Sequence, residues 1–175
     1  YDLLVVPALY AAPEALLQKI NDYVAAGGHL FTTFKTGFTD ENLKVFHDSQ
    51  PHILDRCLGI SYSHFTFPKQ VKLSGETYHC EDNELKNFME LVNPEGAQVL
   101  ASYDHYNWKR YAAVTRNAYG KGTATYLGCW TGDAMLREIL TDVLKDAGLW
   151  GMEQEVEFPV IIKKGTNDLG KEVVY

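Results

Sequence analysis

The sequence has 175 residues, of which 46% are hydrophobic, so it can bury the core of one ordinary domain. Its 23 acidic residues outnumber its 16 basic residues, and the formal charge of −7 argues against nucleic acids and anionic membranes as partners. No apolar run approaches the roughly 20 residues that a membrane-spanning helix needs, and no signal-peptide pattern is visible. The chain opens just before a buried-type strand and without Met, so we expect a segment excised from a longer protein.

The first 42 residues predict a strand, a helix and a second strand. Residues 2–6 and 29–34 are short, almost continuously apolar runs, which is typical of strands covered on both faces of a parallel sheet. Residues 13–26 place apolar side chains on one helical face and end at a glycine pair. We expect a βαβ unit and then a polar loop over residues 35–42, at the end of the sheet where α/β folds place ligands.

The middle of the chain predicts shorter elements. Residues 51–58 look like a short helix closed by Gly59, and the alternating run 60–67 indicates a half-exposed strand. Residues 84–92 stay open between two structures: their apolar side chains recur at helical spacing, whereas the family resemblance given below makes part of this stretch extended. Residues 97–103 predict a further strand.

The second half predicts a hairpin and a helix. Strands over residues 111–116 and 123–128 are joined by a glycine-containing turn, so the sheet gains antiparallel members. Residues 133–147 carry the core stripe of a second clear helix. After an acidic break, residues 156–163 predict a strand, residues 164–171 a turn and residues 172–175 a partner strand. We therefore expect two parts, residues 1–152 and residues 153–175.

The cysteines and histidines indicate no metal or disulfide chemistry. Cys57, Cys80 and Cys129 stand far apart and form no C-x-x-C pair, so we interpret them as buried reduced thiols, which favours a cytoplasmic location. The histidines lack metal-ligand spacing. No G-x-G-x-x-G follows a strand, and Gly120-Lys121-Gly122-Thr123 is better explained by a hairpin turn than by a phosphate loop. We predict no metal and no cofactor.

Two stretches carry polar groups that chemistry or binding would need. Asp40 and Glu41 follow the second predicted strand, but a glycosidase needs two carboxyls roughly 5 to 10 Å apart across a sugar, and adjacent residues rarely present that geometry. A solvated loop, or an Asp that orders its own turn, is the favoured interpretation; a degenerate enzyme using either carboxylate stays open. Residues 103–111, with Trp108, suit core packing, an interface or sugar stacking.

Several stretches resemble the middle domain of the family 42 β-galactosidases, called the trimerisation domain. The matching stretches occur in the family's order: residues 2–10 with the following helix and glycine pair, the loop 33–42 with its aromatic-x-x-Gly-x-x-Asp-Glu-Asn pattern, residues 54–60, residues 97–103 and the hairpin 114–128. The sequence departs from the family at residues 109–113, where a Gly-x-Pro-Ala pattern is usual, and it lacks the strands and helices that precede residue 2 in the family domain.

The resemblance implies a three-layer, doubly wound, flavodoxin-like mixed sheet, similar to class I glutamine amidotransferases, followed by the start of a small C-terminal β domain. Amidotransferases place a nucleophilic Cys at the strand-to-helix elbow, and the comparable turn at residues 35–37 has none. In the β-galactosidases both catalytic glutamates belong to a preceding TIM barrel. The resemblance therefore implies a non-catalytic assembly domain of a homotrimeric hydrolase of β-galactosides.

The candidate contact residues, for a subunit or a ligand, are Lys35, Thr36, Asp40, Glu41, Asn42 and Trp108. The alternative is an independent module with an amidotransferase-like fold that binds a small molecule or a carbohydrate, with its site in residues 35–42.

Overall fold

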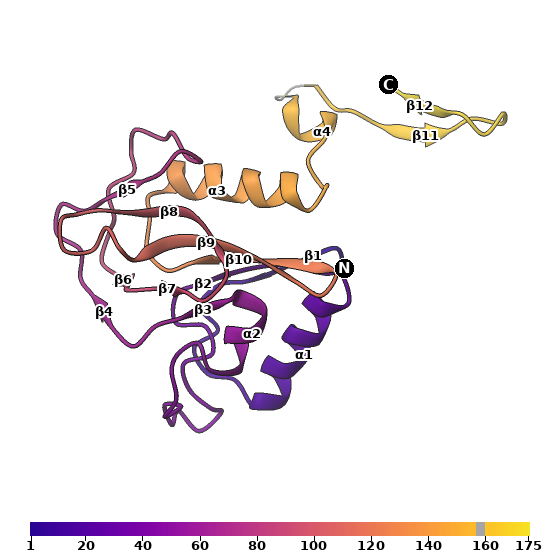
Figure 1. Cartoon of the computed structure of the whole chain (residues 1–175). Coiled ribbons are helices and arrows are strands. Elements are labelled where there is room, and N and C mark those ends of the chain that lie inside the picture. Colours follow the sequence, from indigo (N-terminus) through magenta and orange to yellow (C-terminus); the bar gives the residue numbers. More distant parts are fainter. Residues whose placement is uncertain (157–159) are drawn as a thin grey trace.

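A six-stranded mixed sheet organises the chain, and the computed structural model describes residues 1–156 and 160–175 (Figure 1). The strand order is β1-β2-β10-β9-β8-β5. The strands are β1 (Leu3–Val6), β2 (His29–Thr33), β5 (Lys72–Ser74), β8 (Gln98–Asp104), β9 (Ala112–Tyr119) and β10 (Gly122–Leu127). β1, β2 and β10 are parallel to one another, whereas β9 is antiparallel to both β10 and β8, and β5 is antiparallel to β8.

The predicted βαβ unit is confirmed. Helix α1 (Glu14–Ala25) joins β1 to β2 and buries Leu17, Ile20 and Val24 against the sheet. Gly28 starts the return to β2 at a point where a Cβ atom would lie 2.2 Å from the ring of Tyr23. Gly27, with a φ of 118°, closes the helix, and Gly28 makes room for the tyrosine ring that packs on it.

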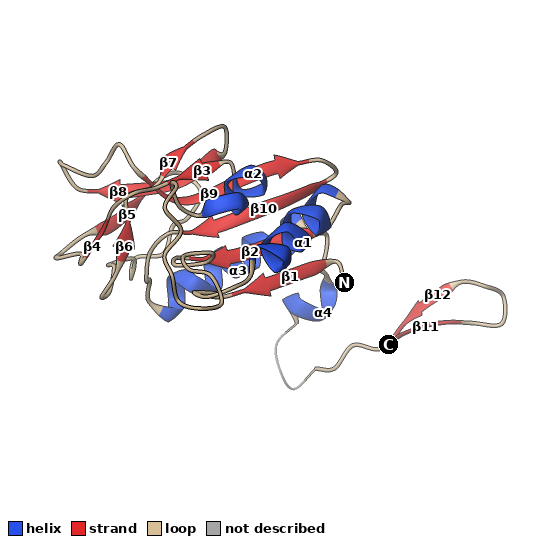
Figure 2. Cartoon of the chain, turned by 90° about the horizontal axis from the view of Figure 1, so that it is seen from below, coloured by secondary structure: helices blue, strands red, loops and turns tan. Residues whose placement is uncertain are grey.

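Helices cover both faces of the sheet (Figures 1 and 2). Helix α1, the 3-10 turn η1 (His52–Leu54) and α2 (Asp55–Leu58) lie on one face, and α3 (Asp133–Asp146) lies on the other. Each face has its own apolar cluster: the first includes Leu17, Leu30 and Leu58, the second Met89, Tyr103 and Ile139. The expected mixed α/β fold is therefore confirmed.

The predicted hairpin is confirmed and is tighter than expected. Strands β9 and β10 pair from Gly122–Tyr119 to Leu127–Val114, leaving a two-residue turn at Gly120-Lys121. Gly120 has a φ of 60°, in the left-handed region that favours glycine. The long strand β10 thereby joins the parallel and antiparallel halves of the sheet.

One prediction in the middle of the chain is corrected, and one open alternative is decided. The run 60–67 is not one strand: β3 (Ile60–Ser61) pairs with β7 (Asn93–Pro94), and β4 (Phe65–Thr66) pairs with β6 (Met89–Glu90). Residues 84–92 are extended, so their helical alternative is wrong. The reason is tertiary: Lys86 donates to the carbonyl of Trp130, and Glu90 to that of Gly128, each at 2.8 Å, so the segment runs beside the chain leaving β10.

The C-terminal part forms a short helix and a small hairpin that lies apart from the sheet in Figure 1. Helix α4 spans Met152–Glu155, and β11 (Lys164–Thr166) pairs antiparallel with β12 (Glu172–Val174). The strand predicted over residues 156–163 is wrong for residues 160–163, which precede β11, and residues 157–159 lie outside the described residues. Within the described ranges, no helix has the length and apolarity required to cross a membrane.

Candidate functional site

The turn that follows β2 lies at the edge of the sheet where the parallel strands β1, β2 and β10 end. Lys35 has a φ of 63°, a left-handed conformation that few non-glycine residues adopt, and Gly37 has a φ of 69°. The buried Thr36 hydroxyl accepts from the Leu9 backbone N–H at 3.2 Å and from the Thr32 hydroxyl at 2.8 Å. Thr36 therefore ties the turn after β2 to the chain leaving β1. We call residues 34–37 the elbow.

The fully buried carboxylate of Glu90 fixes the backbone of the elbow. Glu90, on β6, accepts the backbone N–H of Lys35 at 2.9 Å and the hydroxyl of Tyr126 at 2.6 Å. The Tyr103 hydroxyl donates to the backbone carbonyl of Glu90 at 2.7 Å. Burial raises the pKa of Glu90 to about 7, although the bonds from Tyr126 and Lys35 favour its charged form.

The Lys35 ammonium lies among aromatic rings rather than beside a carboxylate. Its Nζ is 3.4 Å from the ring centroid of Phe65, 3.6 Å from that of Phe38 and 5.4 Å from that of Phe88. Partial burial lowers the pKa of Lys35, and the nearby charge of Glu90 opposes that shift. Within residues 1–156 and 160–175, no carboxylate oxygen lies within 4.0 Å of this ammonium.

Six aromatic side chains form a continuous line along the same edge, which we call the aromatic belt. They come from five segments and touch in the order Tyr10, Phe38, Phe65, Phe88, Phe34 and Trp130, with ring centroids 5.3, 6.3, 5.4, 5.1 and 6.0 Å apart. Tyr10, Phe65 and Trp130 are exposed, and the other three are half-buried. An exposed line of large aromatic rings is unusual for a free surface and is characteristic of binding surfaces.

Two hollows flank the belt. One, of about 230 Å³, is mainly apolar and is lined by Phe34, Trp130, Cys129 and Leu136 with the polar groups of Thr33, Thr131 and Asp133. The other, of about 390 Å³, lies between Phe38, Phe46 and Phe65, with Asp48, Ser49 and Gln50 on its rim. The edge therefore offers rings between two recesses, a shape suited to receiving side chains of a bound surface.

The carboxylates of the predicted loop do not converge on the elbow. Asp40 Oδ1 accepts from the backbone N–H of Asn42 at 2.8 Å and of Lys44 at 2.9 Å, so this side chain orders its own turn. Glu41 and Asn42 are exposed. Trp108 lies elsewhere, in the turn after β8, where it stacks on His105 at 4.0 Å. A contact role for these four residues stays a prediction.

Two of the three thiols expected to be buried, Cys57 and Cys129, are buried, whereas Cys80 is half-buried. Burial raises the pKa of the Cys57 thiol to about 12 and also raises that of Cys129, so both thiols are held protonated. The described residues contain no group of three potential metal ligands from His, Cys, Asp and Glu. Glu90 faces protein groups rather than a cavity. The arrangement at this edge is suited to binding by rings and one cation.

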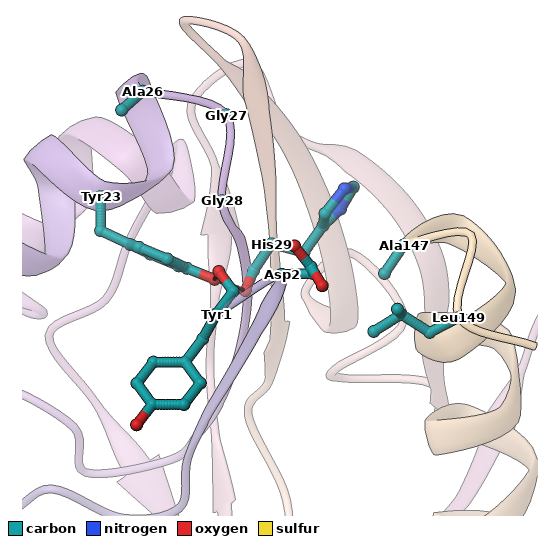
Figure 3. Close-up of a pocket in the computed structure, with 9 residues that line it drawn as sticks. All are labelled: Tyr1, Asp2, Tyr23, Ala26, Gly27, Gly28, His29, Ala147 and Leu149. Atoms are coloured by element: carbon teal, nitrogen blue, oxygen red, sulfur yellow. Dashed lines mark hydrogen bonds between the residues drawn. The ribbon is translucent and has the colours of Figure 1, made fainter.

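A different hollow, of about 490 Å³, lies at the opposite edge, where β1 and β2 begin (Figure 3). Tyr23 extends from α1 toward the backbone of Tyr1, and its hydroxyl donates to the carbonyls of Tyr1 at 3.1 Å and His29 at 3.2 Å. Ala147 and Leu149 line the other side, from the end of α3. The His29 ring lies 2.8 Å from the Thr123 hydroxyl, so its Nδ1 is already engaged within the domain.

The sequence names two residues of the elbow as candidates, and their contact role stays a prediction. Beside Lys35 and Thr36, the structure adds Glu90, which accepts the Lys35 N–H, and Phe65, whose ring lies against the Lys35 ammonium. Trp130 stacks on the neighbouring Phe34. Those three residues come from segments whose pairing was uncertain or unrecognised. The available signal was the number of aromatic residues, 13% of the chain, but composition does not say which rings meet.

A family model described as the β-galactosidase trimerisation domain matches residues 1–150. The chain belongs to this family. The β-galactosidase LacA of Lactobacillus acidophilus is 32% identical across 100% of the chain, which corresponds to 26% of that enzyme. BgaB of a Geobacillus species is 29% identical over 82% of the chain and 21% of the enzyme. The β-galactosidase of Rahnella sp. R3 superimposes with a TM-score of 0.80 at 25% identity, covering 94% of the chain and 25% of that structure.

The trimerisation domain thus spans about a quarter of the length of the enzymes it matches. In this domain the elbow after β2 carries Lys35, and the edge around it carries the aromatic belt. No residue of the domain inherits a catalytic role from these relatives by virtue of the match alone.

Proposed function

We propose that this trimerisation domain is the non-catalytic assembly part of a homotrimeric β-galactosidase whose catalytic barrel lies outside these 175 residues. The observation that carries the proposal is the family match over residues 1–150. The elbow supports it, because residues 35–37 hold Lys35 over phenylalanine rings and contain no cysteine, the nucleophile that an amidotransferase places at this turn. The substrate of the whole enzyme would be a β-galactoside, as the names of the relatives suggest.

Three finer features belong to the same proposal. The sheet would be the amidotransferase-like, flavodoxin-like form of the mixed α/β fold, with its ligand edge converted to assembly. Residues 1–152 would form the trimerisation part, and residues 153–175 a linker and the first strands of a small β domain. The free thiols Cys57, Cys80 and Cys129 suit a reducing, cytoplasmic compartment.

The mass of the full-length enzyme in solution tests the proposal. We expect a trimer over a wide range of protein concentration, and a monomer with full β-galactosidase activity would contradict the proposal. The rate tests the non-catalytic role separately. Asp40→Asn and Glu41→Gln should leave the rate on a β-galactoside unchanged, and a large fall in kcat in a trimer would favour the degenerate-enzyme alternative.

A carbohydrate-binding module is the second candidate, and one observation favours it. Trp130 is exposed beside a hollow that also presents Thr33, Thr131 and Asp133, and an aromatic face with hydroxyl and carboxylate groups is suited to a sugar ring. Titration with galactose or lactose, followed by tryptophan fluorescence, tests this function. A saturable change that disappears in Trp130→Phe would support it.

A further inference from the structure

We propose that the aromatic belt around Lys35 is the surface on which a neighbouring copy of the parent enzyme docks, and that this copy places a carboxylate on the Lys35 ammonium. The inference rests on the proposed function, because it names the surface and the partner chemistry through which the domain assembles the enzyme. It commits to one occupant, a second copy of the same chain. A sugar, or another part of the same polypeptide, is an outcome of the test.

The belt has the composition of the centre of an interface. Its rings are Phe, Tyr and Trp, the side chains enriched where protein interfaces lose water, and three of them are exposed in the domain. A recess flanks the belt on each side, one between Phe34 and Trp130 and one between Phe38 and Phe65. Side chains of a docked surface would fill these recesses and remove the rings from water.

The positive charge of Lys35 determines which chemical group the docking surface must supply. Lys35 is a half-buried cation at the centre of the belt, and no carboxylate within the described parts of the chain lies within 4.0 Å of it. Complete burial of an unpaired ammonium is costly, so a surface that covers the belt must supply an anion. The chain has 23 acidic and 16 basic residues, so a copy of it offers carboxylates in excess.

The Lys35 side chain is held in place before the neighbouring copy docks. The backbone N–H of Lys35 is fixed by Glu90, the Thr36 side chain is buried, and the ammonium already rests on two rings. A side chain that is ordered in the free subunit loses little conformational freedom on binding, so more of the contact energy remains as affinity. This arrangement distinguishes Lys35 from an exposed, mobile surface lysine.

The symmetry of a closed trimer adds a geometric requirement. Each subunit of a ring with threefold symmetry uses two different surfaces, one toward each neighbour. The belt therefore meets a different, carboxylate-bearing surface of the neighbour rather than a second belt. One substitution in the belt changes every interface of the ring once.

The experiment measures the mass of the full-length enzyme by sedimentation velocity across a dilution series. The variants are Phe65→Ser, Trp130→Ser and Lys35→Met, the last of which removes the charge and keeps an unbranched stem. The matched controls are Tyr1→Ser, an exposed aromatic, and Lys121→Met, on the β9–β10 turn, both at the opposite edge of the sheet. Circular dichroism melting checks that each variant is folded.

We expect each belt variant to raise the dissociation constant of the trimer by about tenfold or more, with both controls unchanged. Lys35→Met should also abolish much of the sensitivity of assembly to salt. Folded belt variants that remain trimeric at every dilution would overturn the belt proposal while leaving the assembly function intact. A monomeric wild-type enzyme would overturn both.

Two further results would also overturn the docking proposal. An unchanged trimer whose melting temperature falls in the belt variants would mean that the belt packs against its own polypeptide. A saturable fluorescence change with galactose or lactose that is lost in Trp130→Phe, in a trimer that resists the belt substitutions, would assign the belt to sugar binding.

Discussion

The parallel half of the sheet has an amino edge, where β1, β2 and β10 begin, and a carboxyl edge, where they end. Charged side chains are paired differently at the two edges. Near the edge where β2 and β10 begin, Arg116 bonds Asp142 at 2.9 Å and lies 3.3 Å from Asp146. At the other edge, the Lys35 ammonium rests on rings and Glu90 is buried beneath it. The arginine at the first edge is paired with carboxylates of α3, whereas the Lys35 ammonium has no carboxylate within 4.0 Å in the described residues.

The difference separates residues that hold the fold from residues that are free to bind. The Asp146 carboxylate also accepts from the Thr123 hydroxyl at 2.8 Å, and Asp142 accepts from Tyr78 at 3.0 Å, so the end of α3 is tied to the sheet. The exposed rings at the carboxyl edge, by contrast, contact other rings and the Lys35 ammonium. Substitutions in the Arg116 network should therefore cost stability, and substitutions of the exposed rings should cost assembly. Glu90 is buried beneath those rings and belongs with the residues that hold the fold. The predictions below test stability.

The largest effect on stability is expected at Gly122, where two backbone segments pack closely at the amino edge. A Cβ atom at Gly122 would lie 2.1 Å from the carbonyl oxygen of Gly28 and 2.4 Å from that of Val24. Because neither carbonyl can rotate away, Gly122→Ala must separate α1 from the β9–β10 hairpin. We expect it to lower the free energy of unfolding by about 3 kcal/mol or more, measured by urea denaturation.

Gly151→Ala is the matched control, since its Cβ would meet only the Gln154 side chain at 3.8 Å and its φ is −150°. This substitution should change the free energy of unfolding by less than about 0.5 kcal/mol. Equal costs at the two glycines would contradict a role for the close backbone approach at Gly122 in stability.

The next effect concerns the pH dependence of stability through Glu90. The pKa of its carboxyl is raised by burial from 4.5 to about 7, so between these values the folded protein holds a proton that the unfolded chain has released. The contribution of Glu90 to stability is therefore greatest below about pH 4.5 and falls as pH rises through 7. The groups around it are the Lys35 ammonium, the Cys129 thiol and the hydroxyls of Tyr62, Tyr103 and Tyr126.

Glu90→Gln removes this titration and keeps an oxygen for the Lys35 N–H. Relative to the variant, the wild type should lose on the order of 3 kcal/mol between pH 5 and pH 8, because each unit of pKa shift corresponds to about 1.4 kcal/mol. Urea denaturation at several pH values measures the difference. Glu84→Gln, on the exposed part of the same segment, should follow the wild type, and parallel pH profiles for wild type and Glu90→Gln would disprove the role of Glu90.

A smaller effect is expected from the charge network at the amino edge. Arg116 is largely buried and bonds Thr125 as well as the two carboxylates of α3, so Arg116→Met leaves Asp142 and Asp146 close together without their cation. We expect a loss of about 2 kcal/mol, between the values for exposed and buried pairs.

Breaking an exposed pair provides the contrast. Lys164→Met removes the 3.4 Å contact with Glu153, and both of these side chains are exposed, so the loss should stay below about 0.5 kcal/mol. If Arg116→Met and Lys164→Met lower the free energy of unfolding equally, the ion pairs of Arg116 with α3 contribute no more to stability than an exposed pair.

Elements could be predicted from the sequence where they depend on contacts between residues close together along the chain, and not where they depend on contacts between distant residues. The βαβ unit, the hairpin and α3 were predictable because periodic apolar residues and glycines act locally. Residues 84–92 were not, because their extended form depends on Trp130 and Gly128, which lie about forty residues away along the chain. The belt was missed for the same reason: its six rings come from five separate segments.

The smallest effect concerns Asp40, the carboxylate that the sequence made most tempting. Its Oδ1 accepts two backbone N–H groups, from Asn42 and Lys44, and Asn at this position retains an oxygen in the same place. Asp40→Asn should therefore leave the free energy of unfolding almost unchanged, whereas Asp40→Ala should lower it by about 1 kcal/mol, measured by urea denaturation. A carboxylate that served binding or chemistry would instead fail in both variants, because the amide keeps the turn but not the charge. An equal loss of assembly or of rate in Asp40→Asn and Asp40→Ala would thus show that the Asp40 carboxylate is functional and not only structural.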